Sequence, residues 1–166
     1  MSKTITIDVF DLSSIDAAVR EIREYSKWVQ RKTAELARRL AEMGAVNVSL
    51  GFTRAVCTGN GDVSVTVEQH GENSYSIVAN GESVAFNEFG AGVTYGYGHP
   101  NPTLNGQAMG PGTYPSDKGH WKDPKGWYIP GGEHTYGNPP SMTMYTTAEG
   151  LKRELVRIAR EVFASD

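Results

Sequence analysis

The sequence predicts an α+β fold: an antiparallel β-meander packed with one long N-terminal helix and one C-terminal helix, plus a long Gly/Pro/aromatic-rich loop. Three observations lead to this prediction. Apolar side chains recur every three or four residues near both ends, as in amphipathic helices. Valines alternate with polar residues in the second quarter of the chain, and glycine, proline and aromatic residues crowd the third. We expect a single domain over residues 1–166, because this length can bury one sizeable core.

The first predicted helix covers residues from about 13 to 43, a charged stretch without proline or glycine. Ser13 with Asp16 fits a capping box, and Gly44 is a natural stop. Polar residues interrupt its roughly heptad spacing, so we expect packing on the chain's own sheet rather than a coiled coil. The stripe consists of Ile15, Val19, Ile22, Ser26, Val29, Thr33, Leu36, Leu40 and Met43.

The predicted β-meander covers residues from about 46 to 89. Val63, Val65 and Val67 alternate with polar residues, which is the period of a half-buried strand. Turn-forming sequences at residues 58–62, 70–73 and 80–81 divide the region, and its last run is Val84-Ala85-Phe86. The pattern predicts three or four antiparallel strands.

The predicted loop covers residues from about 90 to 140 and contains all eight prolines and twelve of the nineteen glycines. Its aromatic residues are unusual for a disordered segment and fit anchors that bind a surface, either of the chain's own domain or of a partner. Gly90 and Gly92 would shape the turn out of the sheet, since glycine adopts positive φ freely. The candidate contact residues are Phe89, just before this loop, and Trp121, Trp127, Tyr128 and Tyr136 within it.

The second predicted helix covers residues from about 141 to 164. Either Ser141 or Thr146 could cap its start, the latter with Glu149 closing a capping box. Gly150 lies inside the helix at a mild cost in stability. Its apolar stripe consists of Met144, Ala148, Leu151, Leu155, Ile158 and Val162.

Composition and charge argue against several classes of protein. The net charge of −3 argues against general attraction to nucleic acid, which needs a strongly basic face. Cys57 is the one cysteine, so no intramolecular disulfide can form. The N-terminal residues lack the apolar run of a signal peptide, and no stretch has the length of a membrane span. We therefore expect the protein to fold in a cytoplasm.

The sequence contains only weak signals for a catalytic or a metal-binding site. His99, His120 and His134 stand 21 and 14 residues apart, whereas zinc ligands usually come in close pairs. Asp117, Asp123 and Glu133 are the acidic residues near them. Cys57 shows no neighbouring base, and no nucleophile elbow or phosphate-binding loop is present. We expect no cofactor and no metal.

One segment resembles a known family. Residues 84–93, Val-Ala-Phe-Asn-Glu-Phe-Gly-Ala-Gly-Val, are similar to a segment in the tail-completion or head–tail connector proteins of siphophages. That family continues with a variable glycine-rich loop and then a C-terminal amphipathic helix. Here Gly126-Trp127-Tyr128 and Asn138-Pro139-Pro140 stand in the matching order, although residues 94–125 do not match residue by residue.

The resemblance implies an α+β virion protein without catalytic activity. It implies copies arranged in a ring at the phage neck, with a hexamer as the expected size, beside other neck and tail-tube proteins. DNA would pass through without specific binding, and an acidic sheet bearing Glu68, Glu72 and Glu82 could line that channel. Two alternatives remain open: a carbohydrate- or surface-binding module that uses the aromatic loop, and a metal-dependent hydrolase that uses the loop histidines.

Overall fold

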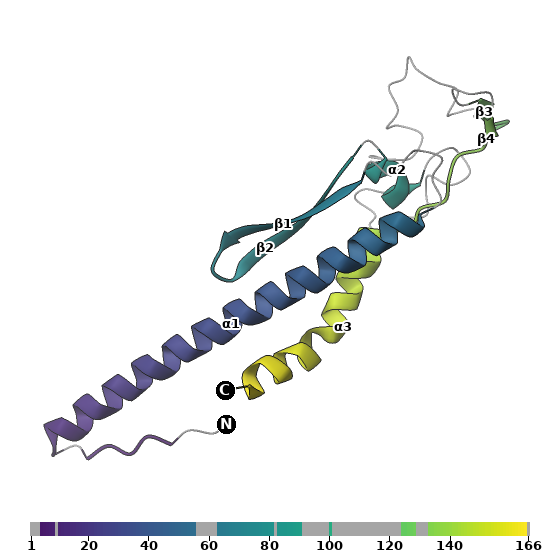
Figure 1. The fold of residues 1–166 in the computed structure, drawn as a ribbon. Coiled ribbons are helices and arrows are strands. Elements are labelled where there is room, and N and C mark those ends of the chain that lie inside the picture. Colours follow the sequence, from purple (N-terminus) through teal and green to yellow (C-terminus); the bar gives the residue numbers. More distant parts are fainter. Residues whose placement is uncertain are drawn as a thin grey trace.

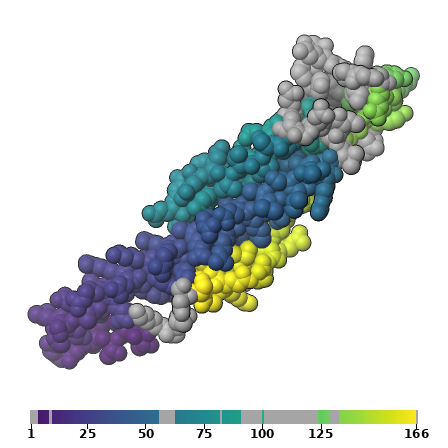
Figure 2. Space-filling model, in the orientation of Figure 1, coloured from purple at the N-terminus to yellow at the C-terminus, as the bar shows by residue number. Residues whose placement is uncertain are grey.

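The computed structural model describes residues 4–8, 10–55, 63–81, 83–90, 100, 124–128 and 133–165. A long helix, α1 (Leu12–Arg54), carries a β-hairpin on one side and a second long helix, α3 (Thr143–Ala164), on the other (Figure 1). The described part is elongated, with the hairpin and α3 lying along the length of α1 (Figure 2). The predicted α+β class, with helices at both ends of the chain and a small antiparallel sheet, is confirmed.

Helix α1 has 43 residues and is about 65 Å long at 1.5 Å per residue. Asp11 caps its start: the carboxylate accepts hydrogen bonds from the Ser13 amide at 2.9 Å and the Ser13 hydroxyl at 2.8 Å. These hydrogen bonds lower the pKa of the Asp11 carboxyl. The predicted capping box of Ser13 and Asp16 is therefore wrong, because the cap lies two residues before Ser13.

Gly44 does not end α1 as predicted, since the helix continues to Arg54. It is buried where α1 passes between the hairpin and α3. A Cβ at this position would lie 2.3 Å from Ile77 Cδ1 and 2.9 Å from Leu151 Cδ1. The glycine therefore permits close packing on two sides of the helix, which outweighs its low helix propensity.

The hairpin consists of β1 (Ser64–Gly71) and β2 (Ser74–Asn80), paired antiparallel with an irregularity between Gln69 and Gly71. Ile77 faces α1, so its partner Val67 lies on the same inner face. The predicted third strand is wrong: residues Val84–Phe89 form a short helix, α2. Residues 46–54 belong to α1, so within the described chain this region contributes two strands to its sheet.

Helix α3 runs antiparallel to α1 (Figure 1). It begins beside Gly51 and ends beside Lys32, so it covers the C-terminal half of α1. Val48 of α1 and Val162 of α3 are fully buried, and Ile158 and Phe52 belong to the same core. Two members of the predicted α3 stripe, Ile158 and Val162, are thus buried, whereas Leu155 is exposed.

Lys32 is buried at 3% exposure and binds the C-terminal end of α3. Its Nζ donates hydrogen bonds to the Ser165 carbonyl at 2.6 Å and to the Ser165 hydroxyl at 3.1 Å. A cation at this position complements the partial negative charge of a helix C-terminus. Trp28, one turn earlier on α1, extends the contact by packing edge-on against Phe163.

The N-terminal half of α1 extends beyond both of its covering elements (Figure 2). Val19, Ile22 and Tyr25 are exposed there, and the first two belong to the predicted apolar stripe. In the described residues, no helix combines the length and apolar character needed to cross a membrane.

Gly51 tests the close contact between α1 and α3. A Cβ on Gly51 would lie 2.3 Å from Thr143 Cγ2, on a β-branched side chain with little freedom to move. We expect Gly51→Ala to lower the free energy of unfolding by roughly 1–2 kcal/mol, since overpacking outweighs the gain in helix propensity. Chemical denaturation measures this change.

Two variants serve as controls for Gly51→Ala. Gly150 has open space around its Cβ position, so Gly150→Ala should raise stability by about 1 kcal/mol. Adding Thr143→Ser, which removes the opposing methyl group, should recover most of the loss at Gly51. A Gly51→Ala protein as stable as Gly150→Ala would contradict the tight contact.

Lys32 tests the anchoring of the end of α3. Lys32→Met keeps the apolar stem and removes the charged donor, so we expect a loss of about 1–3 kcal/mol in unfolding free energy. Lys27→Met, one turn away and exposed, should leave stability unchanged. Equal thermal midpoints for the two variants would argue against the anchoring role.

Candidate interaction site

Two segments separated by about fifty residues meet at the start of α3. The Ser141 amide donates to the Asn87 carbonyl at 2.7 Å, and the Met142 amide donates to the Glu88 carbonyl at 3.2 Å. The Asn138 side-chain amide donates to the Phe86 carbonyl at 2.8 Å. These hydrogen bonds join α2 to the residues before α3, so the two segments form one junction.

The side chain of Glu88 caps α3 from outside the helix. It is 4% exposed, and its two carboxylate oxygens accept hydrogen bonds from the Met144 amide at 2.7 Å and the Tyr145 amide at 2.9 Å. A carboxylate at a helix N-terminus satisfies orphan backbone donors and complements the partial positive charge there. This pairing compensates the cost of burying a charged group.

No local side chain caps α3. Met142, at the N-cap position, has a φ of 52° in the left-handed region and makes no side-chain capping hydrogen bond. Neither predicted cap is correct, because the Thr146 hydroxyl donates back to the Met142 carbonyl and the Ser141 hydroxyl bonds to the Thr143 hydroxyl. The cap comes instead from Glu88 on α2.

Gly90 packs directly against the segment before α3. It is buried with a φ of 77°, and a Cβ there would lie 2.8 Å from Pro140 N and 2.9 Å from the Asn138 carbonyl oxygen. The positive φ disfavours any other residue, and the short distances leave no room for a side chain, so this position requires glycine. Gly92, the other predicted turn residue, lies outside the described residues.

An aromatic cluster occupies the end of the molecule beyond this junction. Strands β3 (Trp127–Tyr128) and β4 (His134–Thr135) form a short antiparallel pair (Figure 1). The His134 ring packs edge-on against Tyr128 and Tyr136, with ring centroids 4.9 Å apart in both pairs. Tyr128 is 72% exposed and Tyr136 is 56% exposed. We call Tyr128, His134 and Tyr136 the aromatic cluster.

The predicted contact residues therefore divide into two groups. Tyr128 and Tyr136 are exposed and available to a partner, whereas Phe89 and Trp127 are half-buried. Trp121 lies outside the described residues. The rings of the cluster are tilted by 73° and 78° to their neighbours, so the cluster presents ring edges as well as faces to a partner.

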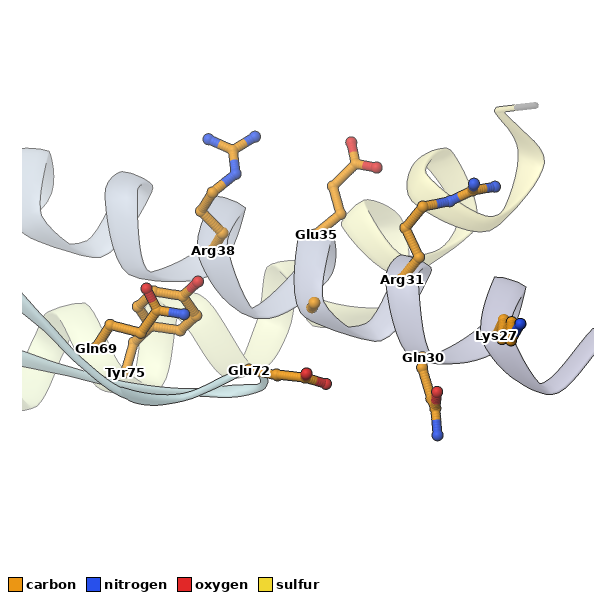
Figure 3. A pocket seen from close by; sticks show the side chains of 9 residues that line it. Lys27, Gln30, Arg31, Glu35, Arg38, Gln69, Glu72 and Tyr75 are labelled. Carbon is orange, nitrogen blue, oxygen red and sulfur yellow. The ribbon is translucent and has the colours of Figure 1, made fainter.

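An open groove lies between α1 and the end of the hairpin (Figure 3). Its volume is about 520 Å³, and Arg31, Glu35 and Arg38 extend from α1 beside it. The groove is wide and solvent-exposed, so it lacks the enclosure of a small-molecule site. Its remaining lining residues are Lys27, Gln30, Ala34, Gln69, Glu72 and Tyr75.

Metal ligands do not converge in the described part of the chain, where no group of three His, Cys, Asp or Glu side chains could hold an ion. His134 instead packs between two tyrosines, and Glu133 lies beside it in sequence and is exposed. His99, His120, Asp117 and Asp123 lie outside the described residues, as does Cys57.

Sequence reasoning missed the role of Glu88. The residue lies in the segment that carries the family resemblance, but nothing local marks it as a cap for a helix that starts 55 residues later. The one hint in the sequence is that the start of α3 has no capping side chain of its own, so the cap must come from elsewhere in the fold.

Comparisons with protein-family models, with curated proteins and with solved structures gave no match for this chain.

Glu88 tests the junction. We expect Glu88→Gln to lower the free energy of unfolding by about 2–3 kcal/mol, because the amide group can accept at one oxygen only and buries an extra donor. Glu149→Gln on the same helix is the control: its ion pair with Lys152 is exposed, so stability should change little. Urea denaturation of both variants measures the difference. Similar midpoints for both would show that the Glu88 cap is dispensable.

Proposed function

We propose that this chain is a virion structural protein, a head–tail connector or tail-completion subunit that forms a ring at the neck of a tailed phage. It is not an enzyme in this proposal. Its partners are copies of itself, with six as the expected number, and the adjacent connector and tail-tube proteins. DNA passes through the ring without specific binding, and the chain is made in the host bacterial cytoplasm.

The observation that carries this proposal is the junction at Glu88. The two segments on which the family resemblance rests, around Asn87-Glu88-Phe89-Gly90 and Asn138-Pro139-Pro140, bind each other directly. Their residue types follow from a structural requirement: a buried cap, a glycine with positive φ and close contact with Pro140. A motif that maintains the fold fits a family whose members act through contact rather than catalysis.

The exposed surfaces give further support. Tyr128 and Tyr136 are large aromatic side chains that remain exposed at one end, and such residues are enriched at protein interfaces. At the other end Val19, Ile22 and Tyr25 remain exposed along α1. Exposed apolar and aromatic side chains at both ends fit a subunit that contacts neighbours on several sides.

The hairpin carries no side chain that would hold the passing DNA. Residues 64–80 contain no lysine or arginine. Glu68 is exposed and points away from the inner face on which Val67 lies, while Glu72 lies at the turn. Glu82 lies outside the described residues. A hairpin without cations would not retain the phosphate backbone, whether its glutamates line the channel or face a neighbouring subunit.

A surface-binding module is the second candidate, because the aromatic cluster is exposed. Sugar binding normally uses the flat face of an aromatic ring, and the tilted rings offer that face only in part. The two candidates predict different behaviour in the virion and in solution. A binding module would act as a monomer and lose its ligand when the tyrosines are removed.

Deletion of the gene from its phage or prophage tests the neck function. We expect induced lysates to contain separate DNA-filled heads and free tails under negative-stain electron microscopy, with the joining restored by the wild-type chain in trans. Intact infectious virions after deletion would exclude the neck function and favour the surface-binding module.

Complementation with Tyr128→Ala/Tyr136→Ala tests the aromatic cluster. We expect phage titre to fall by at least roughly tenfold, since interface aromatics often contribute more than 1 kcal/mol each. Val156→Ala, which trims an exposed side chain on α3, is the control and should complement fully. Normal titre with the double variant would remove the cluster from the proposed interface.

A further inference from the structure

Four cations form a strip along the exposed N-terminal half of α1. Arg20, Arg23, Lys27 and Arg31 are spaced i, i+3, i+7 and i+11, which places them on one side of the helix. All four are exposed, and within the described residues none of them forms an ion pair. By contrast, Arg38 and Arg39 further along α1 bind Glu42 and Glu35. We call these four residues the basic strip.

The basic strip keeps its positive character despite nearby acids. Asp16 and Glu24 lie on the same side of α1, so four cations against two carboxylates leave a net charge of +2. Lys27 and Arg31 reach the open groove, where the chain's own Glu72 lies at the hairpin turn, yet no ion pair within 4 Å forms between them (Figure 3). Beyond this turn the hairpin ends, and α1 continues toward Leu12 past both the hairpin and α3 (Figure 2).

The same chain carries a surface of opposite charge. The hairpin residues 64–80 contain Glu68 and Glu72 and no lysine or arginine, so their net charge is −2. Both glutamates are exposed. Thr66, Glu68 and His70 share the outer face of β1, and His70 is held by a 2.8 Å hydrogen bond to the Ser76 hydroxyl. This outer face and turn are the acidic hairpin surface.

We propose that the basic strip of one copy binds the acidic hairpin surface of a second copy. The two surfaces have equal and opposite net charge, both are exposed, and among the described residues neither has an ion-pair partner. Because they are different patches of one molecule, the contact is heterologous, and repeating it leads to a ring or filament rather than a closed dimer. The inference rests on the proposed ring and names the surfaces that form it.

The contact depends on charge. Val19, Ile22 and Tyr25 are exposed on the same length of α1, but they lie roughly a quarter to nearly half a turn around the helix from the basic strip, so they take no part in it. The charges select the partner and its orientation, and association should weaken with added salt.

Charge reversal tests the proposal on the full-length purified chain. We would measure self-association of the wild type, Arg20→Glu/Arg23→Glu, Glu68→Lys/Glu72→Lys and the combined four-residue variant by sedimentation equilibrium at about 0.05 M and 0.5 M salt. Each double variant should raise the dissociation constant by roughly tenfold or more at low salt, and the combined variant should restore most of the affinity. Arg153→Glu/Arg160→Glu is the control, because it makes the same charge change on exposed sites of α3. This variant should leave the dissociation constant unchanged.

Several results would overturn the proposal. These are a wild type that remains monomeric at low salt, a control as damaging as the strip variant, and a combined variant no better than either double variant. Circular dichroism of every variant shows whether a loss of association is caused by a loss of folding. Recovery of association in the combined variant would exclude misfolding as the cause.

The neck function is tested separately by complementing the gene deletion with the same variants. Unchanged association together with restored virions would reject the interface and keep the neck function. Intact virions without the gene would reject the neck function whatever the variants do in solution.

Discussion

The buried carboxylate of Glu88 at the start of α3 is the interaction on which the rest of the structure depends. Its two oxygens bind consecutive backbone amides of α3, and its own backbone carbonyl accepts from Met142. A charge this deeply buried is stable only with such partners, so α2 and the start of α3 must come together. At the opposite end of α3, the buried Lys32 ammonium binds the Ser165 carbonyl. A carboxylate at the N-terminus and an ammonium at the C-terminus both complement the helix dipole.

With α3 fixed at both ends, α1 becomes the central element of the molecule. Glycines at two positions, Gly44 and Gly51, let the hairpin and α3 approach its backbone closely. The core between these elements is thin, and its fully buried large side chains are Val48 and Val162. A thin core leaves much apolar and aromatic surface outside, at the arm of α1 and at the aromatic cluster. Both surfaces suit a protein that functions by contact with neighbours.

Sequence reasoning succeeded where structure depends on local periodicity. The stripe that starts at Ile15 and the stripe that ends at Val162 predicted two helices, because helical spacing is visible within a few turns. The alternation from Val63 to Val67 predicted a strand for the same reason. It failed at Gly44, which looked like a stop signal but lies mid-helix, and at Val84-Ala85-Phe86, which is helical. The sites of contact were predicted in part, with Tyr128 and Tyr136 exposed and Phe89 and Trp127 half-buried.

The sequence by itself determined the α+β class, the two amphipathic helices, the strand character of residues 64–80 within a larger predicted meander and the distribution of charge between the helices and this region. These follow from interactions between residues that are near each other along the chain. Only the tertiary structure decided that Glu88 caps α3, that Lys32 closes its other end and that Gly44 and Gly51 permit close packing. Each of these depends on partners 33 to 133 residues away. Such contacts form only when folding brings distant segments together, so no local pattern can encode them.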